Sequence, residues 1–129
     1  TGENTISYVT IASLGNATDF SGDRSVAYAF SGGCGGNGKA VTFGGQASQT
    51  YMDYVTIQSL GDANTFDDLS VGGRGVDGCS NETRGTRVGG VANQTTIDYW
   101  SMATPGSAAA FGDLNDGKQY NGSLSGVGL

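Results

Sequence analysis

Acidic turns are the segments of this chain whose residue types could bind a metal ion. Gly61–Asp68 and Gly112–Gly117 both mix aspartate and asparagine with glycine. Carboxylate and amide oxygens are the ligands that calcium prefers, although neither segment has EF-hand spacing and such residues also favour turns by bonding to their own backbone. The sequence therefore offers five calcium candidates but assigns no metal site or cofactor: Asp62, Asp67, Asp68, Asp113 and Asp116.

Aromatic side chains are the second group that could form a site. Tyr8, Tyr54, Tyr99 and Trp100 could stack against sugar rings and so form a glycan-binding platform. Aromatic residues at one repeated strand position more often fill a core or a contact between units. We therefore expect core packing for these four residues and keep glycan stacking as the alternative.

Catalytic chemistry has few candidates. The chain has no histidine, which excludes Ser-His-Asp, Cys-His and His-zinc arrangements within it. Gly33, Gly35 and Gly38 match a dinucleotide-binding pattern, but a strand-like segment follows where that pattern needs a helix. Asp67 and Asp68 would point to opposite faces of a strand, unlike the paired carboxylates of a glycosidase. We therefore expect no catalytic residues and no enzyme.

Charge and length limit the partners. Twelve acidic residues stand against six basic ones in 129 residues, and phosphate binding needs clustered Lys and Arg. No apolar run approaches the ~20 residues that span a bilayer, and the N-terminal residues lack the pattern of a signal peptide. We expect a soluble, mature chain that binds neither nucleic acid nor membrane.

An internal repeat organises the sequence. Its recurring positions are 45 or 46 residues apart: Tyr8, Tyr54 and Tyr99; Phe20, Phe66 and Phe111; and Gly15, Gly61 and Gly106. Cys34 and Cys79 are 45 residues apart, and Ser123 stands where the third cysteine would be. We read the chain as one repeat domain, residues 1–129, with units of approximately 4–49, 50–94 and 95–129.

Each unit is predicted to contain three or four antiparallel strands. In the second unit the first strand is expected at 54–59 and the second at 66–71, because β-branched and aromatic residues are followed there by turn residues. Asn37-Gly38 is typical of a type I′ hairpin. The expected fold is all-β, with propeller-like blades or, alternatively, a threefold β-prism or β-trefoil. The two cysteines, about one inter-sheet spacing apart, are expected to stay unbridged and buried.

The repeated phrase resembles tandem repeats of about 50 residues in virion proteins of marine cyanophages and related tailed phages. The resemblance covers nearly all of the chain and is carried by Ser7–Phe20, Met52–Leu69, Gly78–Ser80, Arg84–Gly85 and Ile97–Leu114.

This resemblance implies a structural or adhesive component of a virion, either decorating the capsid or forming part of a tail fibre. The expected partners are other virion proteins and copies of the chain itself in a homo-oligomer, with host surface glycan as a further partner. The particle would assemble in the host cytoplasm. A lectin-like glycan-binding module and a subunit of an extracellular filament are the alternatives.

Overall fold

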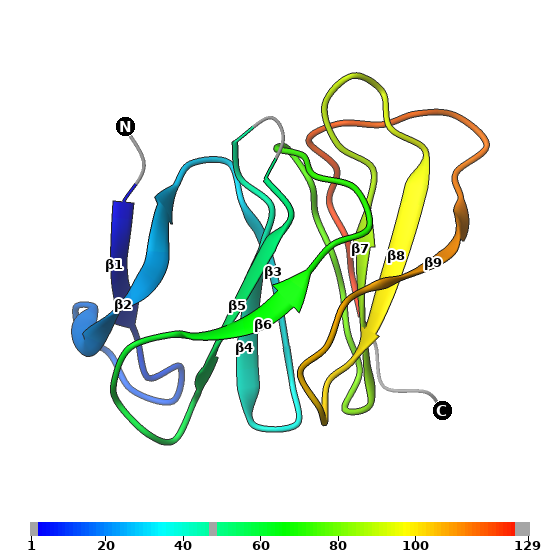
Figure 1. Cartoon of the computed structure of the whole chain (residues 1–129). Coiled ribbons are helices and arrows are strands. Elements are labelled where there is room, and N and C mark those ends of the chain that lie inside the picture. Colours follow the sequence, from blue (N-terminus) through cyan, green and yellow to red (C-terminus); the bar gives the residue numbers. More distant parts are fainter. Residues whose placement is uncertain (1–2, 47–48, 126–129) are drawn as a thin grey trace.

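The computed structural model describes residues 3–46 and 49–125. Within these residues it contains nine β-strands, all paired antiparallel, and no helix (Figure 1). The strands form three separate sheets of two, four and three strands, which lie side by side along the molecule (Figure 1). The expectation of an all-β fold is confirmed.

The first sheet is a two-stranded ribbon. It consists of β1 (Glu3–Tyr8) and the longer β2 (Thr18–Tyr28), whose register shifts twice along their length. Because eleven residues of β2 face six of β1, bulges absorb the difference. In the described part of the chain, no strand pairs with the other edge of β1.

The central sheet has the order β3-β4-β5-β6. Its strands are β3 (Gly32–Gly36), β4 (Lys39–Phe43), β5 (Tyr51–Thr56) and β6 (Asn64–Asp68). The predicted hairpin joins β3 to β4, where Asn37 and Gly38 have φ angles of 49° and 70°, as both central residues of a type I′ turn require.

The third sheet has the order β7-β8-β9, with β7 (Arg84–Val88), β8 (Thr96–Ser101) and β9 (Ala109–Asp113). Residues 77–80 run beside the outer edge of β7 and form two isolated antiparallel bridges with it, Asp77 with Val88 and Ser80 with Gly85.

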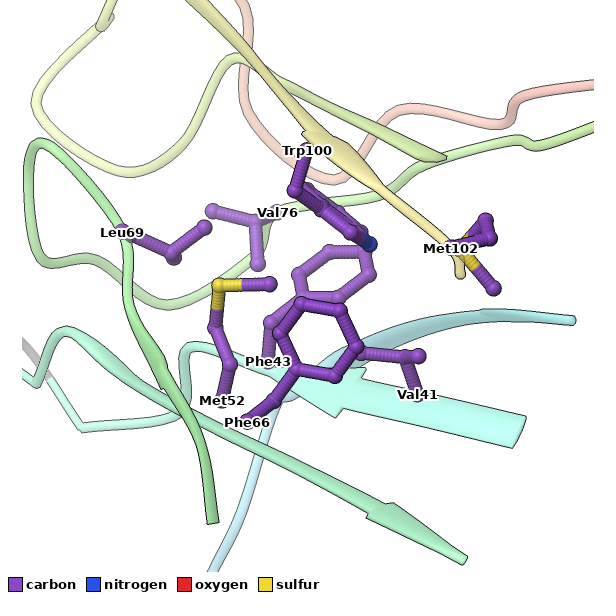
Figure 2. Close-up of a cluster of buried hydrophobic side chains, with 8 residues drawn as sticks. All are labelled: Val41, Phe43, Met52, Phe66, Leu69, Val76, Trp100 and Met102. Carbon is purple, nitrogen blue, oxygen red and sulfur yellow. The ribbon is translucent and has the colours of Figure 1, made fainter. Parts of the chain in front are cut away.

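The main core lies between the central and third sheets. Figure 2 shows its eight buried side chains converging from both sheets and from the segment that connects them: Val41, Phe43, Met52, Phe66, Leu69, Val76, Trp100 and Met102. The central sheet is covered on both faces, and the adjacent residues Met52 and Asp53 of β5 are both buried. This explains the absence of a polar–apolar alternation in its sequence.

Strand boundaries differ from the sequence expectation. β5 covers 51–56 rather than 54–59, because Ser59 N donates to Thr56 O and Ile57 N donates to Gly38 O, which closes a turn after Thr56. β6 likewise ends at Asp68, and Leu69 N donates back to Thr50 O. The turn therefore begins earlier than the β-branched residues suggest.

The chain crosses between sheets within the expected sequence units. The link from β2 to β3 passes from the first sheet to the central one, and the link from β6 to β7 passes from the central sheet to the third. The unit boundary expected near residue 50 therefore falls inside the central sheet, between β4 and β5. The central sheet therefore combines the end of the first expected sequence unit, β3 and β4, with the start of the second, β5 and β6.

Candidate functional site

The five calcium candidates are not gathered into one site. Asp62 Oδ1 accepts from Asp23 N at 3.0 Å, and Asp68 Oδ1 accepts from Thr50 Oγ1 at 2.6 Å. Asp67 lies at the register shift in the pairing of β5 with β6. Within the described residues, no group of three or more acidic or thiol side chains is placed to hold a metal ion.

The other two candidates lie at the end of the third sheet. Asp113 Oδ1 accepts from Thr95 Oγ1 at 3.0 Å, which repeats the contact between Thr50 and Asp68 after 45 residues. Asp116 pairs with Lys118 at 2.7 Å on an exposed turn, and this hydrogen bond lowers the pKa of the Asp116 carboxyl. These carboxylates fasten local turns.

The expectation of core packing is wrong for Tyr8, which is 41% exposed, whereas Tyr54 and Tyr99 are partly buried. All three tyrosines make the same contact in their own sheets. Tyr8 meets Phe20, Tyr54 meets Phe66 and Tyr99 meets Phe111, each edge to face with ring centroids 5.7 to 6.0 Å apart. Arg84 lies 4.9 Å from the centroid of the Tyr99 ring, and Lys39 lies 5.9 Å from that of Tyr54.

Trp100 lies in the core. It is buried against Phe43, with ring centroids 5.1 Å apart, and its indole covers the backbone of Gly85. Core packing is therefore confirmed for Trp100, and its ring faces are closed to a sugar.

Buried carboxylates mark both sheet-to-sheet contacts, and sequence reasoning missed them. Ser25 of β2 donates to Asp53 of β5 at 2.8 Å, and 45 residues later Ser70 donates to Asp98 of β8 at 2.5 Å. The signal that could have found them is an aspartate just before the repeated tyrosine, where polar side chains in a fully covered strand require partners.

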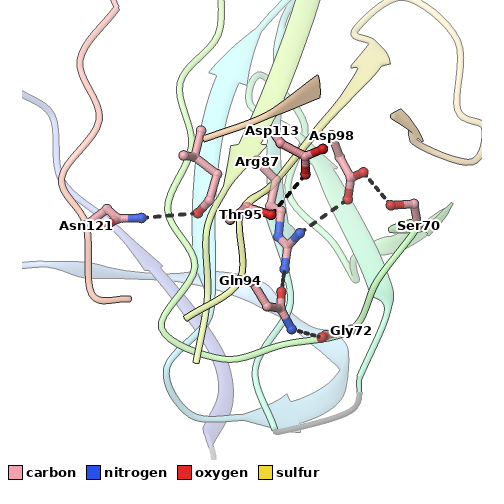
Figure 3. A network of polar contacts seen from close by, with 9 residues as sticks. Ser70, Gly72, Arg87, Gln94, Thr95, Asp98, Asp113 and Asn121 are labelled. Atoms are coloured by element: carbon pink, nitrogen blue, oxygen red, sulfur yellow. Dashed lines mark hydrogen bonds and ion pairs between the residues drawn. The ribbon is translucent and has the colours of Figure 1, made fainter. Parts of the chain in front are cut away.

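An arginine lies near each buried carboxylate, but the two arginines do not occupy corresponding strands. Arg87 of β7 lies directly opposite Asp98, with Nη1 3.6 Å from Oδ2 and both side chains fully buried (Figure 3). The Arg87 guanidinium also donates to Gln94. Asp53 instead faces Arg24 of the first sheet, and the negative charge of Asp53 partly opposes the lowering of the Arg24 pKa by burial. Burial lowers the pKa of both arginines.

A small cavity of about 90 Å³ remains between the first and central sheets. Its lining includes Val55 and Thr42. Forty-five residues later the corresponding positions hold Trp100 and Arg87, which are larger and fully buried. Larger side chains therefore fill the contact between the central and third sheets at the positions where the contact between the first and central sheets leaves a cavity.

The two cysteines are unbridged, as expected, and half-buried rather than fully buried. Burial raises the pKa of the Cys34 thiol from 9.0 to about 11. The residue 45 positions after Cys79 is Leu124 and not Ser123, the residue expected there from the sequence. Two backbone hydrogen bonds support this correspondence. Gly75 N donates to Phe30 O and Tyr120 N donates to Gly75 O, so each bond joins residues that are 45 positions apart.

An open cleft lies where the three segments that carry Phe30, Gly75 and Tyr120 meet. It is lined by Phe30, Ser31, Gly75, Val76, Asp77, Tyr120 and Asn121. The rings of Phe30 and Tyr120 are exposed, and the polar groups of Asp77 and Asn121 lie in the same cleft. This cleft combines exposed aromatic rings with polar residues.

Both ends of the row of sheets are uncovered. Val9, just after β1, is 59% exposed, whereas Val55 and Trp100 at the corresponding positions of the next two sheets are 9% and 2% exposed. At the other end Phe111 is 59% exposed, whereas the corresponding Phe66 is 2% exposed. Side chains at corresponding positions are thus buried inside the row of sheets and exposed at its two ends.

The described residues contain no helix long and apolar enough to cross a membrane. Neither the protein-family models nor the curated proteins compared with the chain match it.

Proposed function

We propose that this protein is a non-enzymatic structural component of a phage particle, acting by assembly and surface contact. The observation that carries the proposal is the recurrence of sheet-to-sheet contacts at a fixed spacing, together with the exposure of the corresponding side chains at both ends. Repeats that bury their faces only against neighbours are typical of modular contact proteins. The sequence resemblance supplies the virion context, as a capsid decoration or a tail-fibre part assembled in the host cytoplasm.

We infer further that the fold consists of three units of one repeat arranged as propeller-like blades. Backbone contacts between neighbouring sheets support this reading. Ala63 N donates to Asp23 O at 2.9 Å, and Ala108 N donates to Asp68 O at 2.8 Å. A four-stranded row is the size of a propeller blade, and the central sheet has that size.

The virion role is tested by analysing phage particles purified from lysates of a host whose phage encodes the chain. Mass spectrometry is expected to detect its peptides at a fixed stoichiometry to the major capsid protein, and immunogold labelling to mark one part of the particle. Peptides found only in the unbanded lysate would contradict the proposal. Cell extracts from an uninfected host provide the control.

A glycan-binding role is the second candidate, favoured by the cleft between Phe30 and Tyr120. Both rings are exposed, and a sugar ring binds an aromatic face with polar groups at its rim. On a glycan array, Phe30→Ala and Tyr120→Ala are expected to abolish any binding, while Tyr51→Ala, at an exposed tyrosine outside the cleft lining, should retain it. Binding that survives both changes would rule out this cleft.

A further inference from the structure

Two surfaces of the molecule correspond to the two sides of its internal contacts. The first, the β1 edge, is the end of β1 from Ile6 to Tyr8, which has no second strand beside it in the described residues, together with Val9 and Thr10, which follow the strand. The second, the β8 face, is the outer face of the third sheet. Its residues are Thr86, Val88, Ile97, Tyr99 and Phe111. We propose that the β1–β2 ribbon of one copy docks on the β8 face of a second copy, continuing the row of sheets head to tail. This proposal rests on the proposed function.

The β8 face matches a surface that the chain itself covers. Each of its five residues lies 45 positions after a residue of the central sheet: Val41, Phe43, Met52, Tyr54 and Phe66. Those five belong to the main core or pack against it, beneath the third sheet. The apolar side chains of the β8 face therefore require the same kind of cover, an antiparallel sheet of this repeat.

The β1 edge lacks the strand that its counterparts have. Val55 of β5 lies opposite Ala40 of β4, and Trp100 of β8 lies opposite Gly85 of β7. Val9 holds the corresponding position with no strand beside it in the described residues. A free edge with exposed apolar side chains is a template for strand pairing between chains.

The polar residues also fit this arrangement. Inside the chain each contact buries one aspartate with one arginine nearby, Asp53 with Arg24 and Asp98 with Arg87. At the new contact the aspartate position holds Ser7. The second copy would present there Leu114 and Asn115, which correspond to Arg24 and Ser25 in the first unit. Neither buried charge is present, so no unpaired ion would be enclosed.

Two copies joined in this way would form a closed ring with six sheets. Propellers typically contain four to eight blades, a range that three sheets do not reach and six do. A head-to-tail contact gives a ring when the rotation closes and a filament when it does not. The expected state is a dimer with two equivalent contacts.

Sedimentation velocity and light scattering of the purified chain over a wide concentration range test the proposal. Physiological salt limits repulsion between two chains that each carry a net charge of −6. A dimer is expected, and Val9→Asp and Phe111→Asp should each weaken it by at least about tenfold. Leu60→Asp is the control, because Leu60 is as exposed as Val9 and Phe111 (59% each) and belongs to neither surface. Circular dichroism checks that each variant folds.

Mixing the two variants distinguishes a head-to-tail contact from a face-to-face one. One of the two contacts in a Val9→Asp and Phe111→Asp pair is unaltered, so the mixture should dimerise more tightly than either variant alone. A monomer at every concentration, or a dimer that Phe111→Asp abolishes and Val9→Asp leaves unchanged, would overturn the proposal. Long polymers sensitive to both changes would support the contact and overturn ring closure.

The proposed function and this contact can fail separately. If the chain is found in purified particles but is monomeric in solution, the virion role is supported and the proposed contact between copies is refuted. If the chain forms a dimer with the expected response to the variants but is absent from purified particles, the contact is supported and the virion role is refuted.

Discussion

The indole of Trp100 packs directly on the backbone of Gly85, its partner across β7 and β8. A Cβ atom built at Gly85 would lie 2.5 Å from Cε2 and Nε1 of the ring. Forty-five residues earlier the same pair is Ala40 and Val55. The large Trp100 thus lies opposite a glycine, which has no side chain, whereas the smaller Val55 lies opposite an alanine, whose side chain is a methyl group.

Gly85→Ala should therefore destabilise the protein. The added methyl group cannot fit beside Trp100 without a shift of the ring, and overpacking of this kind costs about 1–3 kcal/mol. The free energy of unfolding measured in urea checks this value. Gly106→Ala is the matched control, because a Cβ there meets nothing within 4 Å, and it should leave stability unchanged or slightly raised. Equal stability of the two variants would contradict the described packing.

Val55→Ile should stabilise the protein, because Val55 lines the cavity between the first and central sheets. One buried methylene group that fills empty space contributes about 0.8 kcal/mol. Thermal unfolding measures the gain as a higher Tm. Val41→Ile provides the contrast, because Val41 is buried in the filled core on the other face of the sheet, and the same added methylene should lower Tm. A gain at both positions would mean that cavity filling is not the cause.

Arg87→Met should be strongly destabilising. It leaves the Asp98 carboxylate buried with Ser70 as its described hydrogen-bond partner, and breaking a buried pair from one side typically costs about 3–5 kcal/mol. Adding Asp98→Asn to this variant should recover much of the loss, since the uncompensated charge is removed. The exposed Lys118 supplies the control, and Lys118→Met should not change stability measurably. Urea unfolding of the wild type, Asp98→Asn, Arg87→Met and the double variant tests the pair, and additive losses would exclude coupling.

Cys34 should react slowly with iodoacetamide in the folded protein. Because burial raises the pKa of its thiol from 9.0 to about 11, the thiolate fraction at pH 8 falls about a hundredfold, and the thiolate is the nucleophile. Mass spectrometry of the Cys34 peptide, with the unfolded chain as the reference, measures the rate. Because burial disfavours the thiolate, this group lowers the stability of the folded protein as pH rises from 9 to about 11, and the effect is absent below pH 9. Labelling as fast as in the unfolded chain would contradict the described burial.

The sequence carried enough local signal to predict the strand content and one hairpin. Asn37-Gly38 specifies its own turn, and β-branched and aromatic runs specify extended backbone. These features depend on residues near one another in the chain.

The buried ion pair and the sheet boundaries could not be predicted in this way. Arg87 and Asp98 look like surface residues in the sequence, and their burial follows only from the register of β7 with β8 and from the cover of the central sheet. The sequence repeat likewise shows where similar residues recur but not which neighbours their strands choose. Strand pairing across the expected boundary near residue 50 is a long-range property that the local sequence does not carry.

That boundary has a consequence for chain integrity. Phe43 and Tyr51 end and begin adjacent strands of one sheet, so a protease cut between them would leave both fragments held together by the β4–β5 ladder. Each fragment would contain two strands of the central sheet, and Val41 and Phe43 on the first fragment would pack against the core side chains of the second. Separately produced fragments should therefore recombine as a split protein.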